Sequence, residues 1–240
     1  MGELTLRRRL DPLLGVDVYE VKLGDEYLMS SLFTVAEVEL AVLGLGAADG
    51  ADLDVVVGGL GLGYTARAAL DDPRVRSVLV VEALPEVVDW HRRELFPDTA
   101  GLATNPRVRL LHGDFFASVG TGWDPGSPEG TYDAVLLDID HSPRHVLHPS
   151  HAAFYSKEGL RQVARRLRDG GVFALWSDDP PDSAFEEALG CTFAVVDTHV
   201  VRFPNPFTGG ESANTVYVAA RPLFQAPPVD VDLQIGPKPT

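Results

Sequence analysis

The 240-residue sequence is poor in cysteine, with Cys191 as its single representative. One cysteine excludes an intramolecular disulfide and a cysteine-rich metal site, and this usage favours a reducing compartment, so we expect a cytoplasmic protein. Apolar runs of about 18 residues are also absent, so we expect no membrane span. The arginine-containing segment 1–15 is broken by Asp11 and Pro12, which is not typical of a signal peptide.

Basic residues are scarce as well, because 20 Lys and Arg stand against 35 Asp and Glu and give a formal net charge of −15. Nucleic-acid binding needs a basic surface, so we expect no nucleic-acid partner. An acidic surface tolerates or attracts a cationic small molecule. The same charge is also explained by solubility alone, since mutual repulsion keeps proteins apart.

Hydrophobic residues make up 45% of the chain and occur in runs that alternate with helical patterns. This alternation predicts a parallel sheet that helices cover on both faces. The first strand begins at residue 53, and the other expected strands are 77–82, 107–114, 132–138, 172–177, 192–203 and 214–221. The expected helices run from Thr34 to Gly46, from the glycine-rich turn to residue 70, and over 86–95, 156–171 and 182–190.

The two ends of the chain differ from this pattern. Residues 15–31 alternate around a Gly-Asp turn and predict a β-hairpin. The last two strands are joined without a helical pattern, which predicts an antiparallel pair at one edge of the sheet. We therefore expect a short N-terminal hairpin segment (1–33), a Rossmann-like, doubly wound, seven-stranded α/β domain (34–222) and a flexible, proline-rich C-terminal tail (223–240).

A glycine-rich turn follows the first strand of the sheet and precedes a helix. It contains Gly58, Gly59, Gly61 and Gly63. Small residues let a backbone turn sharply and approach a ligand, while the following helix offers free N–H groups. In open α/β sheets, ligands bind at this carboxyl edge of the strands.

Acidic residues end the next two strands. Glu82 is placed to accept hydrogen bonds from both hydroxyls of a ribose, and Asp114 with Phe115 suits an adenine amino group and ring face. The alternative for both acids is that each caps the following helix. Three strand-end features in register favour an adenosine-containing ligand.

The segments VVVGGLGLGYTARAAL, VLVVEALPEVVDWHR, VRLLHGDFF and YDAVLLDIDHSP, in this order and spacing, resemble the class I S-adenosylmethionine-binding fold. More specifically, they are similar to spermidine synthase and its bacterial relatives, the polyamine aminopropyltransferases. The similarity extends over about residues 15–221. It implies that the glycine turn and Glu82 hold the nucleoside and that Asp114 recognises adenine.

The resemblance also implies a catalytic aspartate, the first of a D-[ST]-[ST]-D-P-like segment, which falls on Asp138. A carboxylate there positions an amine and accepts its proton during attack on a carbon bonded to sulfonium. The second aspartate of that segment falls on His141 or, with a shift of one residue, on Asp140.

Several positions depart from the pattern of the family. Leu62 replaces the aspartate of the glycine turn, and no H-S-x-Y-Q segment precedes residue 30. The acidic-aromatic segment upstream of the turn is reduced to a match at Glu37. The nucleoside half of the pattern is thus better preserved than the polyamine half.

Four histidines, His141, His145, His148 and His151, follow Asp138. A zinc site would require them on one helix face, and the prolines between them oppose a continuous helix. We expect no metal ion. The alternatives are a solvated loop, or one or two histidines that line the acceptor pocket and relay a proton near neutral pH.

The sequence therefore predicts a transferase of polyamine biosynthesis that moves an aminopropyl group from decarboxylated S-adenosylmethionine to an amine. One alternative is an S-adenosylmethionine-dependent methyltransferase that acts on a small molecule. Another is a nucleoside-binding protein without catalytic activity. The related synthases suggest a homodimer.

Overall fold

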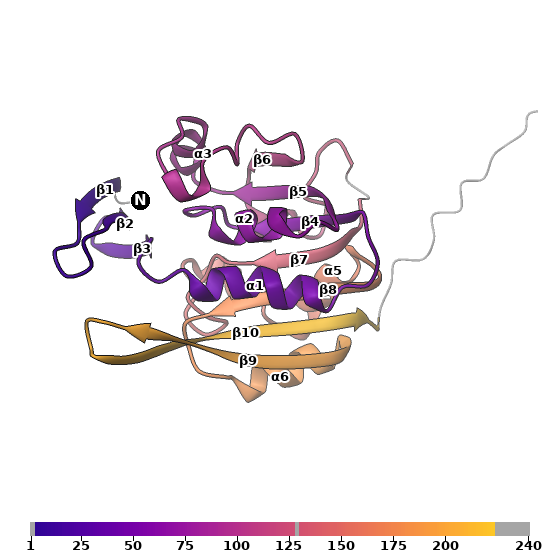
Figure 1. The fold of residues 1–240 in the computed structure, drawn as a ribbon. Coiled ribbons are helices and arrows are strands. Elements are labelled where there is room, and N and C mark those ends of the chain that lie inside the picture. The colour runs from indigo at the N-terminus through magenta and orange to yellow at the C-terminus, as the bar shows by residue number, and fades with distance from the viewer. Residues whose placement is uncertain (1–2, 128–129, 224–240) are drawn as a thin grey trace, which may run out of the picture.

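The computed structural model describes residues 3–127 and 130–223, and a seven-stranded sheet forms its centre. The strand order is β6-β5-β4-β7-β8-β10-β9 (Figure 1). The first five strands are parallel, whereas β10 is antiparallel to both β8 and β9. The strand bounds are Leu53–Gly58 (β4), Val75–Glu82 (β5), Val108–His112 (β6), Tyr132–Leu137 (β7), Leu167–Ser177 (β8), Phe193–Asn205 (β9) and Gly210–Pro222 (β10). The predicted doubly wound fold is confirmed.

Helices cover both faces of the sheet and form two apolar cores. The first core contains residues from α1, α2 and α3, and the second contains residues from α4, α5 and α6. The helix bounds are Val35–Gly46 (α1), Tyr64–Asp71 (α2), Pro85–Arg92 (α3), Phe115–Ser118 (α4), Lys157–Ala164 (α5) and Ser183–Gly190 (α6), with 3-10 turns at Pro97–Thr99 (η1) and Pro149–Ala153 (η2). None of the helices in the described part of the chain has the length and apolar character needed to cross a membrane.

The N-terminal segment is a three-stranded antiparallel sheet rather than a hairpin alone. Strands β2 (Asp17–Leu23) and β3 (Glu26–Ser30) form the predicted hairpin, and β1 (Leu4–Leu10) pairs with β2 from Leu4 opposite Leu23 to Leu10 opposite Asp17. Figure 1 places this small sheet beyond the ends toward which the parallel strands point. The N-terminal sheet therefore lies over the edge where a ligand is expected.

The helix predicted over 156–171 is wrong in its second half. Helix α5 ends at Ala164 and β8 begins at Leu167, where it pairs with Tyr132. Strand pairing prevails over the helical pattern because Arg168 forms ion pairs with Asp133 of the neighbouring β7 and with Asp54 of β4, the next strand along. Tertiary contacts of this kind regularly override helix propensity.

The predicted edge pair is confirmed, and its connection is shorter than the sequence suggested. Strands β9 and β10 pair from Phe193 opposite Pro222 to Asn205 opposite Gly210, so only residues 206–209 remain as a turn. The tip of this hairpin lies on the same side of the molecule as the N-terminal sheet (Figure 1). The tail predicted to be flexible lies outside the described residues from position 224 onward.

Candidate active site

The site lies at the carboxyl ends of β4 and β7, where the strand order reverses. Successive helices leave the sheet toward opposite faces at such a point, which opens a crevice for a ligand. The backbone N–H of Asp138 donates to the carbonyl oxygen of Gly58 over 2.8 Å, so the end of β7 is fixed against the start of the glycine turn. The sequence predicted both the glycine turn after the first central strand and the aspartate that follows the fourth.

The glycine turn needs its glycines for two physical reasons. Gly59, Gly61 and Gly63 have φ values of +91°, +49° and +92°, a region that side chains disfavour. In addition, a Cβ on Gly59 would collide with the carbonyl oxygen of Asp138. The turn therefore lies directly against the residue that the family resemblance marks as catalytic.

Three side chains form hydrogen bonds with the backbone of the glycine turn. The carboxylate of Glu82 accepts the N–H of Leu60 over 2.8 Å. A ring nitrogen of His91 lies 2.9 Å from the carbonyl oxygen of Gly61, and the Thr99 hydroxyl donates to the carbonyl oxygen of Leu62 over 2.8 Å. The sequence analysis missed His91 and Thr99, since nothing in their local sequence indicates which loop they contact.

Glu82 is 7% exposed, and burial raises the pKa of its carboxyl group. Its second oxygen accepts the N–H of Leu84 over 2.8 Å. Helix α3 begins at Pro85 and has no side-chain cap bond, so the helix-cap alternative does not describe Glu82. The Glu82 carboxylate lies beside the glycine turn. Its binding of ribose hydroxyls stays a prediction.

Asp114 and Phe115 lie differently from Glu82. Asp114 is exposed and accepts the N–H of Ala117 over 3.0 Å, so one of its oxygens caps α4. Phe115 is 2% exposed and stacks on Trp123 at 4.8 Å within the second core. Recognition of adenine by this pair stays a prediction, and burial leaves the Phe115 ring face little room for it.

The aromatic residue that borders open space here is Phe116. Together with Asp114 it lines a cavity of about 310 Å³ between α4 and the start of α5. The ring of His151 stacks on Phe116 with centroids 4.0 Å apart. The sequence analysis did not select Phe116, because two adjacent phenylalanines give no indication of which one faces the core.

Asp138 follows β7 and is half-buried. Its carboxylate accepts the hydroxyl of Thr65, in the first turn of α2, over 2.8 Å. Burial raises the pKa of Asp138 to about 6, while the Thr65 hydrogen bond opposes this rise by stabilising the charged form. A carboxyl group with such a pKa can accept a proton near neutral pH.

Glu37 is the acidic residue of the first turn of α1 and the electrostatic neighbour of Asp138. Burial, followed by repulsion from Asp138, raises the pKa of Glu37 to about 8. One of its oxygens is buried and has no hydrogen-bond partner among the described residues. The family pattern marked Glu37 as a match, and the fold brings it close enough to Asp138 for the two carboxyl groups to form an electrostatically interacting carboxyl pair.

Asp140 is 1% exposed and has three donors of its own. It accepts the N–H of Leu147 over 2.7 Å, a ring N–H of His151 over 2.9 Å and the hydroxyl of Tyr155 over 2.8 Å. These bonds tie the segment after β7 to η2 and the start of α5. Asp140 is therefore placed as an anchor of this segment, and its predicted catalytic role has no support from these contacts.

The four histidines of the segment point to separate partners. Nε2 of His141 lies 3.7 Å from Glu26 of the N-terminal sheet, and a ring nitrogen of His145 lies 2.7 Å from Asp179. His148 contacts Ser150, and His151 contacts Asp140. Over residues 3–127 and 130–223, no three His, Cys, Asp or Glu side chains are grouped so as to hold a metal ion.

The Ser142, His145 and Asp179 cluster contains the residue types of a hydrolase triad without its geometry. The Ser142 hydroxyl lies 2.5 Å from Asp179 and 3.3 Å from Nδ1 of His145, and Asp179 contacts the same Nδ1. A triad requires the serine and the carboxylate on opposite ring nitrogens. This cluster instead joins the segments that follow β7 and β8.

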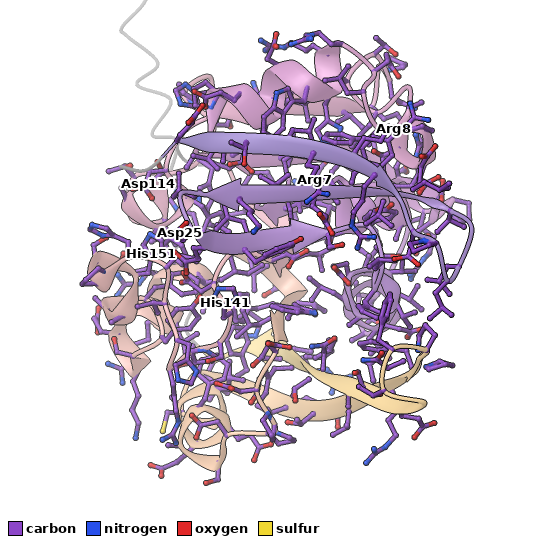
Figure 2. The ribbon with its side chains drawn as sticks, turned by 90° about the vertical axis from the view of Figure 1, so that its left-hand side faces the viewer. Arg7, Arg8, Asp25, Asp114, His141 and His151 are labelled. Carbon is purple, nitrogen blue, oxygen red and sulfur yellow. The ribbon has the colours of Figure 1, made fainter. Side chains whose placement is uncertain are left out.

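The N-terminal sheet covers the glycine turn. Leu62 of the turn packs in a small core with Val21 and Phe96, and Met29 of β3 borders it. A Cβ on Gly61 would lie 3.3 Å from the sulfur of Met29. Figure 2 shows the strands of this sheet in front of the central sheet, with His141 and His151 near its lower edge. The N-terminal sheet thus packs directly over the glycine turn.

Fold and site together define the class, because the chain has the class I S-adenosylmethionine-binding fold. Its site contains the glycine turn after β4, the buried Glu82 at the end of β5 and Asp138 after β7. No protein-family model matches the chain. A polyamine aminopropyltransferase of Corynebacterium efficiens is 32% identical over 163 residues, which are 65% of this chain and 30% of that protein. Polyamine aminopropyltransferase 2 of Pseudomonas aeruginosa is 30% identical over 63% of this chain and 43% of its own length.

Solved structures are similar over a larger share of the chain. Spermidine synthase from Thermotoga maritima matches with a TM-score of 0.68 and 16% identity, over 92% of this chain and 70% of that one. A spermidine synthase in complex with the transition-state analogue AdoDATO matches with a TM-score of 0.69 and 16% identity, over 92% and 72%. The predicted resemblance to spermidine synthases is confirmed, although the chain spans less than half the length of the two aminopropyltransferases named above.

Proposed function

We propose that the protein transfers an aminopropyl group from decarboxylated S-adenosylmethionine to a small amine, as a cytoplasmic enzyme of polyamine biosynthesis. The observation that carries the proposal is the position of Asp138, whose backbone bonds to the start of the glycine turn and whose charge acts on Glu37. The similarity to aminopropyltransferases from two bacteria supports the reaction class. The single cysteine supports the compartment.

In this proposal the nucleoside lies along the carboxyl edge of the sheet. The glycine turn approaches its sugar, Glu82 accepts the ribose hydroxyls, and Asp114 lies beside the adenine. Binding at this edge brings the sulfonium of the nucleoside close to the end of β7, where Asp138 lies. The nucleoside is a co-substrate, and no metal is required for displacement at a sulfonium carbon.

The reaction is a single displacement. The lone pair of the acceptor nitrogen forms a bond to the propyl carbon next to sulfur, and the carbon–sulfur bond breaks with its electron pair moving to sulfur. Sulfur changes from a sulfonium to a neutral thioether. Asp138 holds the amine in line and accepts the proton that the nitrogen loses, which its pKa of about 6 permits near neutral pH.

Methyl transfer is the second candidate function. Putrescine N-methyltransferase 3 of Nicotiana tabacum is 31% identical over 118 residues, which are 49% of this chain and 28% of that enzyme. The same site geometry serves this reaction, because an amine also attacks a sulfonium carbon when the methyl group is transferred. The two reactions differ in the co-substrate, which carries a carboxylate only in the methyl donor.

A direct comparison of donors tests the proposal. The protein is incubated with 1,4-diaminobutane and either decarboxylated or intact S-adenosylmethionine, and the products are analysed by mass spectrometry. We expect an aminopropyl adduct with the decarboxylated donor alone. A methylated amine with the intact donor would establish the methyltransferase, and nucleoside binding without either product would establish the non-catalytic alternative.

A further inference from the structure

The outer side of β9 is an unpaired strand edge. β9 is the last strand of the seven-stranded sheet, and no strand within residues 3–127 and 130–223 pairs with its outer side (Figure 1). β9 has 13 residues, whereas β6, the strand at the opposite edge, has 5. An edge strand leaves alternate backbone N–H and C=O groups free, and these groups form a template for another strand.

Features that normally protect a long edge are few in β9. The strand contains no lysine, and its one proline, Pro204, is the second-last residue. Its register with β10 runs without a bulge from Val195 to Asn205. Val195 and Val200 are 37% and 45% exposed, and the alternation of a strand places them on opposite faces of the sheet. An exposed, regular and apolar edge of this length indicates a site to which another strand adds.

The charges on β9 permit the approach of a second copy of the chain. The formal net charge of −15 opposes contact between most surfaces of two copies. β9 is different, because its charged residues are one acid, Asp197, and one arginine, Arg202, with His199 between them. Two copies can therefore meet along β9 with little repulsion between like charges.

The sequence of β9 is complementary to itself in an antiparallel pair. A two-fold axis perpendicular to the sheet relates two such strands, and residues directly opposite each other point to the same face. With the axis at Thr198, Asp197 of each copy lies opposite His199 of the other, where a ring N–H can donate to the carboxylate. The pairs beyond these are valine with valine, namely Val196 opposite Val200 and Val195 opposite Val201.

The neighbouring registers lack this complementarity. An axis at His199 places Asp197 opposite Val201 and Arg202 opposite Val196, so that each charge faces a valine. An axis at Asp197 places the two aspartates directly opposite each other, which is destabilising. The side chains of β9 therefore select the register with Thr198 at its centre.

We infer that β9 pairs antiparallel with β9 of a second copy of this chain, centred on Thr198, so that the two central sheets become one continuous sheet. The two-fold axis forms every contact away from Thr198 twice, which doubles the effect of each complementary pair. The pairing also satisfies the free backbone groups of both edges. β9 is three strands away from β7, so this contact does not depend on the proposed reaction.

The first test is the mass of the full chain in solution, measured by light scattering over a dilution series. Wild type is expected to have twice the chain mass of 25.9 kDa. Val200→Lys places an ammonium group opposite Val196 in both contacts and is expected to weaken the dimer about tenfold or more. Val42→Lys is the matched control, because Val42 is a 54% exposed valine of α1, outside β9.

The second test is of the register. In a Cys191→Ser background, Thr198→Cys places two thiols opposite each other at the axis, within the Cα distance that a disulfide requires. Oxidation with diamide is expected to give a covalent dimer in non-reducing electrophoresis. Val200→Cys is the control, since the two copies of position 200 are about 14 Å apart along the strands in this register, too far for a disulfide.

A wild type that is monomeric throughout the dilution series overturns the inference. Hydrogen–deuterium exchange that shows protected β9 amides in a monomer also overturns it, because another part of the chain then covers the edge. A dimer that Val200→Lys and Val42→Lys weaken equally contradicts the role of β9, and equal cross-linking of Thr198→Cys and Val200→Cys contradicts the register. Circular dichroism verifies that the variants are folded, and the cross-linking decides if Val200→Lys is not.

Discussion

The hydroxyl of Thr65 donates to the carboxylate of Asp138 over 2.8 Å and thereby connects the start of α2 to the end of β7. This bond stabilises the charged carboxylate and lowers the pKa of Asp138 against the effect of burial. In the proposed reaction, the charge state of Asp138 at neutral pH therefore depends on a residue outside the segment that carries this aspartate. Thr65 was not selected from the sequence.

Thr65→Val is expected to move the acid limb of the activity profile to higher pH. Activity requires charged Asp138, and loss of the hydrogen bond favours its protonated form. We expect kcat/KM at pH 6 to fall about three- to tenfold, the range for one hydrogen bond to a charged group, with a much smaller change at pH 8.5. Thr65→Ser keeps the hydroxyl and should retain the wild-type profile; equal profiles for Val and wild type would contradict the assignment.

Glu82→Ala is expected to weaken binding of the nucleoside and also to loosen the glycine turn, because Leu60 loses its acceptor. Calorimetric titration with 5′-methylthioadenosine should show at least a tenfold loss of affinity, on the scale of a lost charged hydrogen bond. Glu86→Ala is the control, since Glu86 is exposed in the first turn of α3. Unchanged affinity in Glu82→Ala would remove Glu82 from the site.

Glu37→Gln is expected to stabilise the free protein at high pH. The carboxyl group of Glu37 has a raised pKa of about 8, so the folded state holds a proton that the unfolded state releases near its ordinary value of 4.5. Stability from this group is full below about pH 4.5 and is lost as pH rises toward 8. Thermal melts should show a Tm about 2–4 °C above wild type at pH 8.5 and no difference at pH 4.5. The opposite pH dependence would refute the carboxyl pair.

Asp140→Asn tests whether Asp140 anchors its segment. The asparagine amide has only one oxygen, so it cannot accept all three hydrogen bonds. Its NH₂ group, itself a donor, would face the donating hydroxyl of Tyr155 or ring N–H of His151. We expect a loss of roughly 2–4 kcal/mol in the free energy of unfolding, measured by denaturant titration. Asp25→Asn, in the exposed turn between β2 and β3, should have no measurable effect. A stable but inactive Asp140→Asn would instead favour a catalytic role.

Local sequence was sufficient to predict the central sheet and the glycine turn. Each central strand is a short apolar run in the sequence. Each glycine of the turn lies where a side chain would be unfavourable, as at Gly59, where a Cβ would collide with the backbone of Asp138. Strand β1 was missed because its arginines interrupt the apolar pattern. Their ion pairs with acids across the N-terminal sheet, such as Arg9 with Glu20, compensate for that interruption.

The interaction between the carboxyl groups of Glu37 and Asp138 could not be predicted from local sequence. Glu37 is 101 positions before Asp138, and their charges interact only because α1 packs so that its first turn lies near the end of β7. The anchoring of Asp140 also depends on where η2 folds back. Local patterns predict elements well, whereas partnerships between distant side chains follow from packing.

The central claim is that Asp138 is the base of an aminopropyl transfer. The most direct measurement is product formation by wild type and Asp138→Asn, with decarboxylated S-adenosylmethionine and 1,4-diaminobutane, together with the nucleoside affinity of each protein. We expect the variant to keep its nucleoside affinity and to lose about 10²-fold or more in turnover, the scale of a lost general base. Wild-type turnover by Asp138→Asn would contradict the account.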